Sequence, residues 1–260
     1  MAVAVGTSGW QYRSWRGRLY AGVPQRAWLP HYAARFATVE LNTTFYSLPR
    51  LSSVEGWAAT TPEDFCFAAK ASRYLTHLKR LREPEPAVAV YLERLEPLIR
   101  AGKLGPILIQ LPPNFAVDCA RLEGCLAAFP RGLRLAVEVR HPSWFCPEVR
   151  TLLERRDVPL CLSDRRGLRE PEWRTASWGY VRFHEGRAAP WSCYGPGALS
   201  TWAERVARLW PTDEDVFVYF NNDPNGCAPR DAQRFAKLCS GGGLSVTRVP
   251  VEPMPVGEDD

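Results

Sequence analysis

Side chains suited to acid–base and anion-binding chemistry crowd the end of one short apolar segment, residues 133–144. The segment opens as an apolar run and closes with Glu138, Arg140 and His141. Charge is costly in a buried strand, and side-chain alternation puts Glu138 and Arg140 on one face. Ser143 then stands at the expected N-cap of a helix that reaches about residue 156. A strand that ends in charge and leads into a helix is typical of a βα barrel, whose chemistry lies at the carboxyl ends of the strands.

Comparable polar groups follow the other strand-like segments, and three of the four histidines are among them. The groups that can transfer protons are the candidate catalytic residues, namely Glu40, Glu138, His141, His184 and Asp164. The groups that can hold a ligand are the candidate substrate-binding residues, namely Ser8, Trp10, Tyr12, Asn42, Tyr46, Lys70, His77, Gln110, Arg140, Trp144, Arg182, Asn221, Asn222 and Asp223. Because parallel barrel strands end at one rim, these side chains predict a pocket there.

The residue types in this set favour an anionic substrate. Arg140, Arg182 and Lys70 can hold an anion, since arginine makes bidentate contacts with phosphate. Glu40 and Glu138 can form an acid–base pair if their surroundings differ, because unlike environments push two carboxyl pKa values apart. The leading hypothesis is therefore an enzyme, a hydrolase or lyase, that acts on a small, phosphate-bearing substrate at the carboxyl rim.

Structural roles are the alternative for several of these residues. Glu40 and Glu138 can be partners of Lys70, Arg140 or Arg182 in buried ion pairs that only lock the rim. The run of residues 221–223, Asn-Asn-Asp, is also typical of a tight turn. Tryptophans near the first strand can equally fill the core.

Two further functions remain open on the sequence. Histidines and carboxylates at strand ends can hold a divalent metal, as in barrels of the endonuclease IV and xylose isomerase type, although no HxH or HExxH spacing is present. We assign no metal ligands, and the cofactor stays unknown: no required cofactor is evident from the sequence, and a divalent metal is the alternative left open. Exposed aromatics beside an arginine-containing mouth can also stack bases, which would make the protein a non-catalytic nucleic-acid-binding module.

The elements that must position these residues form one alternating series. Near-continuous apolar runs, typical of parallel strands buried on both faces, occur at residues 3–6, 38–41, 65–69, 107–111, 133–139, 160–163, 180–183 and 216–220. Amphipathic helical patterns lie between most of them, at residues 25–36, 87–100, 121–129, 199–209 and 231–239. The α/β alternation predicts a single-domain (β/α)8 TIM barrel over residues 1–250. The polar sixth crossover, residues 164–177, predicts a short or degenerate helix, and residues 251–260 predict a disordered acidic tail.

The bulk composition agrees with this fold. A chain of 260 residues, 46% hydrophobic, matches the ~250 residues that such a barrel needs. The formal charge of +5 permits an anionic partner without forming a basic tract. The eight cysteines show no CxxC pair, so we expect reduced structural thiols and a cytoplasmic protein. We see no signal peptide and no apolar run long enough for a membrane helix, and the sequence does not predict the oligomeric state.

Several motifs together resemble the YecE-like family, whose members carry a domain of unknown function numbered seventy-two. The motifs, which span nearly the whole chain, are Gly6-Thr-Ser-Gly-Trp10, Val39-Glu-Leu-Asn-Thr-Thr-Phe-Tyr46, Gln110-Leu-Pro-Pro113, Glu138-Val-Arg-His141, Tyr180-Val-Arg-Phe-His184 and Tyr219-Phe-Asn-Asn-Asp223. One departure is Glu185, which stands where the family usually has glycine after this histidine. The resemblance implies a TIM barrel and no settled activity.

Overall fold

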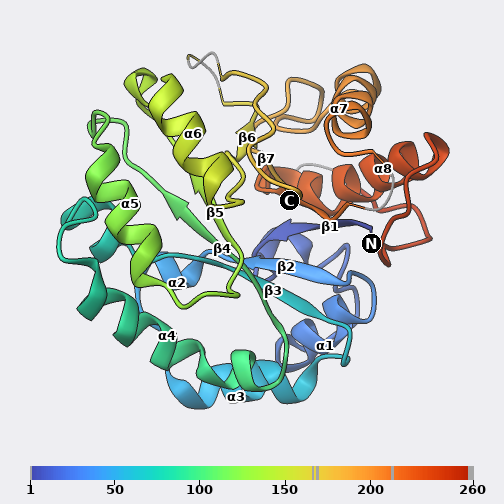
Figure 1. The fold of residues 1–260 in the computed structure, drawn as a ribbon. Coiled ribbons are helices and arrows are strands. Elements are labelled where there is room, and N and C mark those ends of the chain that lie inside the picture. The colour runs from blue at the N-terminus through green and yellow to red at the C-terminus, as the bar shows by residue number, and fades with distance from the viewer. Residues whose placement is uncertain (1, 166, 168–169, 212–213, 257–260) are drawn as a thin grey trace.

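The computed structural model describes residues 2–165, 167, 170–211 and 214–256, and these form a nearly closed parallel barrel (Figure 1). The strands lie in the order β5-β4-β3-β2-β1-β8-β7-β6. Their bounds are β1 (Val3–Ser8), β2 (Thr38–Leu41), β3 (Cys66–Lys70), β4 (Leu104–Gln110), β5 (Leu135–Glu138), β6 (Leu162–Ser163), β7 (Gly179–Phe183) and β8 (Val216–Phe220). The seam falls between β5 and β6, which an isolated bridge between Val137 and Leu160 connects. The predicted TIM barrel is confirmed.

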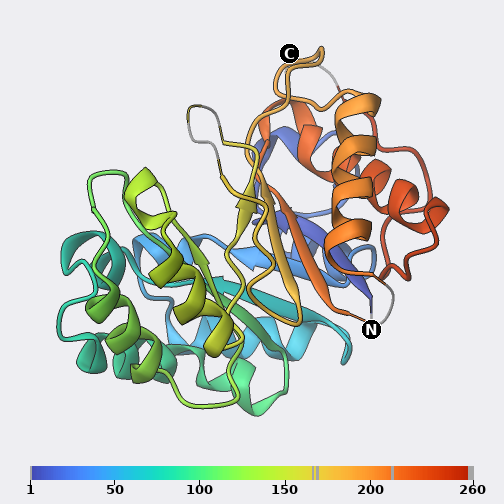
Figure 2. The ribbon, with the colours of Figure 1, turned by 45° about the horizontal axis from the view of Figure 1, so that its top comes forward.

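Helices surround the strands, as Figures 1 and 2 show from two directions. The α-helices are α1 (Trp28–Ala33), α2 (Thr43–Tyr46), α3 (Leu51–Thr60), α4 (Pro84–Arg100), α5 (Cys119–Ala128), α6 (Pro147–Arg155), α7 (Pro196–Leu209) and α8 (Cys227–Gly241). Short 3₁₀ segments occupy Arg13–Trp15, Gln25–Ala27, Pro142–Trp144 and Pro224–Gly226, and a π-helical turn occupies Tyr74–Leu78. Between β6 and β7, the described residues contain no helix, in agreement with the predicted degenerate crossover.

The alternation of side chains along the strands creates an apolar floor and a polar layer inside the barrel. One face of each strand packs against the helices, as Val5, Val39 and Val137 do. The other face contributes a second buried cluster, which includes Ala68, Leu108, Ala136, Tyr180 and Tyr219. Side chains two positions apart on a strand point to the same face. On β3, β4, β5 and β7, the residue two positions after each of these apolar residues therefore also faces the barrel interior, nearer the carboxyl ends of the strands. Those residues are Lys70, Gln110, Glu138 and Arg182, all buried.

Gly6 allows the first two strands to approach closely. A Cβ atom at this position would lie 2.3 Å from the carbonyl oxygen of Thr38 on β2. Such a contact is far inside van der Waals distance, so any other residue would push β1 away from β2. The side chains of Ser8 and Glu40, which are register partners on these two strands, depend on that spacing.

The helix after β5 begins later than the sequence suggested. Ser143 was expected at the N-cap, but α6 starts at Pro147 and its N-cap is Cys146. Residues Pro142–Trp144 form a 3₁₀ turn instead, because Pro142 fixes the backbone at its start. The Ser143 hydroxyl is used across the rim, where it accepts a hydrogen bond from the Val117 amide at 2.8 Å.

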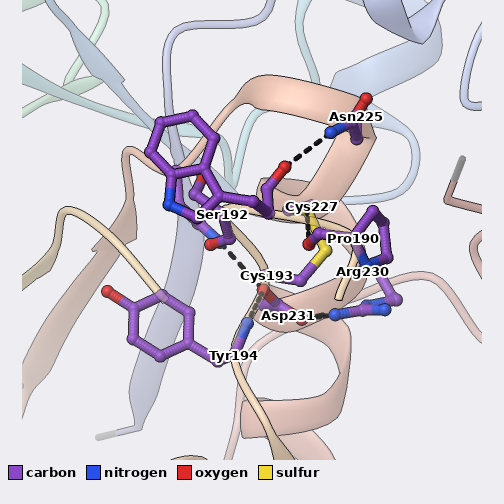
Figure 3. The surroundings of a disulfide bond; sticks show 10 residues. Pro190, Ser192, Cys193, Tyr194, Asn225, Cys227, Arg230 and Asp231 are labelled. Atoms are coloured by element: carbon purple, nitrogen blue, oxygen red, sulfur yellow. Dashed lines mark hydrogen bonds and ion pairs between the residues drawn. A yellow bond between two sulfur atoms is a disulfide. The ribbon is translucent and has the colours of Figure 1, made fainter. Parts of the chain in front are cut away.

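A disulfide bond corrects the prediction that the cysteines are all reduced. Cys193, in the loop between β7 and α7, is bonded to Cys227 at the start of α8 (Figure 3). The sequence carried no signal for this pair, since 34 positions separate the two cysteines and the fold alone brings them together. The other six cysteines are free thiols, and the cytoplasmic location stays a prediction.

The end of the described chain is tied to α8. The Gln233 amide donates hydrogen bonds of 2.6 Å to the carbonyl oxygens of Pro250 and Glu252. Residues 257–260 of the expected acidic tail lie outside the described residues, so its disorder stays a prediction. No helix in the described part of the chain is long and apolar enough to cross a membrane.

Candidate functional site

A guanidinium between two carboxylates forms the centre of the barrel mouth. Arg182 donates from Nη2 to Glu40 Oε1 at 2.8 Å and from Nη1 to Glu138 Oε2 at 2.6 Å. All three side chains are essentially excluded from solvent. They come from β7, β2 and β5, so the contact joins strands that are not neighbours in the sheet. We call these three residues the central triad.

Each carboxylate of the central triad has further donors. Glu40 accepts from the hydroxyls of Ser8 and Tyr180, both at 2.7 Å. Burial opposes ionisation of Glu40, yet Arg182 and these hydroxyls lower its pKa. Glu138 accepts from Gln110 Nε2 at 2.8 Å and from Arg140 Nε at 3.0 Å. Burial likewise opposes its ionisation, but nearby cations, above all Arg182, hold its pKa well below the usual range. Both groups are therefore ionised at neutral pH.

Cations outnumber these carboxylates at the mouth. Lys70 is buried, and its Nζ lies 4.0 Å from the centre of the Phe45 ring. Burial, and then the charge of Arg182, lower the pKa of Lys70 to about 8. Arg165, which the sequence analysis did not select, follows β6, and its Nη1 is buried with no hydrogen-bond partner among the described residues. Burial and the charge of Arg140 lower the pKa of Arg165.

The histidines of the rim differ in their surroundings. His184 is partly buried, and its Nε2 lies 3.8 Å from Glu138 Oε1. Burial, followed by the charge of Arg182, lowers the pKa of His184 to about 4. Burial and the charge of Lys70 do the same for His77, whose Nδ1 lies 2.9 Å from the Thr76 hydroxyl. Both rings are neutral at pH 7. His141 faces Ser143, with its Nδ1 2.8 Å from the hydroxyl oxygen.

Two acidic groups near the mouth hold protons unusually well. Glu170 accepts hydrogen bonds of 2.7 Å from the amide and the hydroxyl of Ser163, the last residue of β6. Burial raises the pKa of Glu170 to about 7. Burial also raises the pKa of Asp164, although that carboxyl accepts bonds from the Tyr194 hydroxyl and the His184 amide. Glu170 could not be selected from the sequence, because it lies in the irregular link and no strand-end pattern marks it.

Some residues selected from the sequence support the rim from behind. Trp144 is fully buried and donates from its indole nitrogen to the Phe115 carbonyl at 2.7 Å. The Asn222 side chain is also buried, and it donates to the Ser192 carbonyl and to Asp231. Asp231 in turn accepts from the Tyr194 amide, beside the disulfide (Figure 3). Asn221 stands nearer the mouth, where its amide oxygen lies 3.4 Å from Asn42 Nδ2. The prediction that Trp144 and Asn222 bind substrate therefore has no support from their positions.

A pocket of about 440 Å³ opens on the β1–β2 side of the mouth. We call it the rim pocket, and the residues that line it are Gly9, Trp10, Gln11, Tyr12, Asn42, Thr43, Tyr46, Ser47, Pro49, Ser53 and Trp57. Gly9 has φ of +95°, and a Cβ atom there would lie 3.1 Å from the Tyr12 hydroxyl. The absence of a side chain at this glycine leaves room for the Tyr12 ring. Asp223 is not among the lining residues, but its charge raises the pKa of Tyr12, after the larger effect of burial.

The residues at the mouth do not fit a bound divalent metal. Within the described residues, no three His, Cys, Asp or Glu side chains are grouped to hold an ion. The position between Glu40 and Glu138, where a cation would bind, is filled by the Arg182 guanidinium. We therefore derive no chemical step through a metal.

The fold and this mouth define a TIM-barrel protein with a charged, buried cluster at the rim where such barrels place their active sites. A family model described as "Protein of unknown function DUF72" matches residues 4–254. The chain belongs to the DUF72 family, as the motif resemblance predicted.

Related proteins agree with this assignment. The UPF0759 protein YecE of Escherichia coli strain K12 is 32% identical over 170 residues, which are 63% of this chain and 60% of that protein. The UPF0759 protein YunF of Bacillus subtilis strain 168 is 26% identical over 251 residues, covering 81% of this chain and 86% of that protein. The crystal structure of a DUF72 family protein from Thermotoga maritima has a TM-score of 0.81 at 29% identity, covering 92% of this chain and all of that one.

Proposed function

We propose that the protein is an enzyme that binds a phosphate-bearing substrate at the carboxyl rim of the barrel. The observation that carries the proposal is the surplus of cations there. Four cations, Lys70, Arg140, Arg165 and Arg182, stand against the two carboxylates of the central triad, Glu40 and Glu138. A buried cation is unfavourable unless a negative charge compensates it. An anionic ligand would provide that charge.

The donors that remain open at the mouth suit a phosphate group. The Lys70 ammonium lies against the Phe45 ring and forms no salt bridge within the described part of the chain. The Nη1 of Arg165 likewise has no hydrogen-bond partner there. Arginine offers a planar pair of donors to phosphate oxygens, and lysine adds a point charge. Both terminal nitrogens of Arg182 already donate to the carboxylates of Glu138 and Glu40, so we assign Arg182 to positioning the site rather than to binding the anion.

Glu170 is the best candidate for proton transfer. A general acid or base works best when its pKa is near the working pH, and burial brings the pKa of Glu170 to about 7. Glu40 and Glu138 are ionised by their cations and are less suited to donate a proton. This assignment moves the acid–base role from the predicted glutamate pair to the carboxyl beside Ser163. A hydrolase or lyase reaction on a phosphate ester remains our proposal for the chemistry.

Thermal unfolding in phosphate tests the binding step. At equal ionic strength, phosphate should raise the unfolding temperature of the wild-type protein more than chloride does, by ~2–4 °C for each kcal/mol of binding free energy. Arg140→Ala should abolish the difference, and Lys70→Met should reduce it. Arg134→Ala is the matched control, because Arg134 pairs with Asp215 at the opposite end of the barrel. The protection should also weaken above about pH 8, where Lys70 loses its charge.

If phosphate raised the unfolding temperatures of Arg140→Ala and Lys70→Met as much as that of the wild-type protein, the proposed anion site would be wrong.

The catalytic step needs a separate measurement. We expect at least one compound in a panel of phosphate esters to be converted, as followed by ³¹P NMR, and Glu170→Gln to stop the conversion. Phosphate protection without conversion of any ester would show a binding protein in place of an enzyme.

A further inference from the structure

The rim pocket has aromatic walls beside a charged mouth. Trp10 and Trp57 meet edge to face, with ring centroids 5.6 Å apart, and they form its buried side. Tyr46 forms an open side, with 77% of its surface exposed. An exposed aromatic ring at the edge of a pocket is a feature of binding surfaces, because burying it on a ligand is favourable.

The lining of the rim pocket is uncharged at neutral pH, unlike the mouth. Burial raises the pKa of Tyr12 further above the neutral range. Two amide side chains, Gln11 and Asn42, supply hydrogen-bond donors and acceptors. The volume, about 440 Å³, is within the range of small-molecule sites, ~300–1,000 Å³. Flat aromatic walls and edge amides fit a planar ring that carries hydrogen-bonding atoms.

The pocket and the central triad are connected by direct contacts. The Tyr12 hydroxyl donates to the Ser8 carbonyl at 2.5 Å, and the Ser8 hydroxyl donates to Glu40. On the other side, Tyr46 packs edge to face on Phe45, the ring that also carries the Lys70 ammonium. The aromatic side chains of Tyr46 and Phe45 therefore connect a ligand in the rim pocket to the Lys70 ammonium.

We infer that the substrate carries a planar, nitrogen-containing ring that lies in the rim pocket, with its anionic group at Lys70 and Arg140. The inference rests on the proposed function, because it assigns the second half of the same substrate. It adds the class of compound: a ring-bearing phosphate such as a nucleoside monophosphate, as opposed to a simple sugar phosphate.

The ring site is tested by measuring the binding of two phosphate ligands, one with a ring and one without. Adenosine 5′-monophosphate and ribose 5-phosphate carry the same phosphate, and only the first has a base. By calorimetry, we expect the wild-type protein to bind the nucleotide at least about tenfold more tightly, since stacking one base is worth ~1–3 kcal/mol. Tyr46→Ala should remove most of that preference and leave the affinity for ribose 5-phosphate unchanged. Ser53→Trp, which places a large ring in the pocket from the exposed face of α3, should do the same.

The control is Tyr74→Ala, which removes a half-exposed tyrosine from the next loop that does not line the rim pocket. This variant should keep the preference. Equal affinities of the wild-type protein for the two compounds would overturn the ring site while leaving the anion site intact. Failure of ribose 5-phosphate to bind the wild-type protein would instead overturn the proposed function. A loss of preference in Tyr74→Ala as large as in Tyr46→Ala would place the ring elsewhere and refute the assignment to this pocket.

Discussion

The two ends of the barrel use the same ion-pair chemistry in opposite surroundings. At the end where the strands begin, Arg134 pairs with Asp215 at 2.7 Å, and the two side chains are 42% and 24% exposed. At the mouth, Arg182 pairs with Glu40 and Glu138 at similar distances, but each of these side chains is at most 1% exposed. An exposed pair needs little desolvation and contributes little, whereas a buried pair needs a great deal.

This difference in burial indicates that the ion pairs at the mouth have a role besides stabilising the fold. Apolar residues of similar volume often replace a buried ion pair without loss of stability. Stability alone therefore gives no reason to place a guanidinium and two carboxylates among Tyr180, Gln110 and Ser8 inside the barrel. A requirement for charge at the mouth does give a reason, and the predictions below test this comparison.

The largest effect is expected from removing the central cation. Arg182→Met leaves Glu40 and Glu138 buried and facing each other without the guanidinium, and it should lower the free energy of unfolding by ~3–5 kcal/mol. Urea denaturation followed by tryptophan fluorescence measures the loss. If Arg182→Met unfolded at the wild-type urea concentration, the central triad would be no more important to the fold than the exposed pair.

A smaller effect, of opposite sign, is expected at Glu170. Its pKa is about 7 in the folded protein and near 4.5 when unfolded, so the folded state keeps a proton that the unfolded state releases. This group therefore lowers stability progressively as the pH rises from about 4.5 to 7. Glu170→Gln should remove the decline and gain on the order of 1–3 kcal/mol at pH 8 relative to the wild-type protein. No gain should appear below pH 4.5, and urea titrations at the two pH values decide the point.

The smallest effect is expected at the other end of the barrel. Arg134→Met breaks the exposed pair with Asp215 and should lower the free energy of unfolding by at most about 1 kcal/mol. The guanidinium also lies 5.5 Å from the centre of the Trp178 ring, a contact that the methionine side chain partly retains. In high salt the loss should shrink further, because the pair is screened. A loss as large as that of Arg182→Met would remove the contrast between the two ends.

The sequence predicted the barrel well because buried parallel strands leave a direct signal. Residues 216–220 are continuously apolar and form β8, and the degenerate sixth crossover follows from the polar residues after Asp164. The mouth was predictable for the same reason, since the period of two places Glu138 and Arg182 inside the barrel.

The other features of the site and the disulfide depend on long-range contacts that no local sequence pattern encodes. Glu170 and Arg165 lie in the link between β6 and β7, whose described residues form no helix or strand, so the sequence pattern does not place them at the mouth. The partner of Cys193 could not be chosen from the sequence either, because several cysteines were available and chain spacing does not select among them. Trp144 shows the reverse case: its place after a strand suggested a ligand contact, whereas its indole nitrogen donates a hydrogen bond to the buried Phe115 carbonyl.

The central triad also connects the strands on either side of the incomplete seam between β5 and β6. Strand β6 has only the two residues Leu162–Ser163 and pairs with β7, and an isolated bridge joins β5 to Leu160, just before β6. The bond from Arg182 on β7 to Glu138 on β5 crosses this gap above the backbone. A side-chain ion pair thus stabilises the β5–β6 seam, where the strands share few main-chain hydrogen bonds. The same three residues lie at the proposed binding site and hold the barrel wall together across the seam, so a variant that loses ligand binding must also be checked for loss of barrel structure.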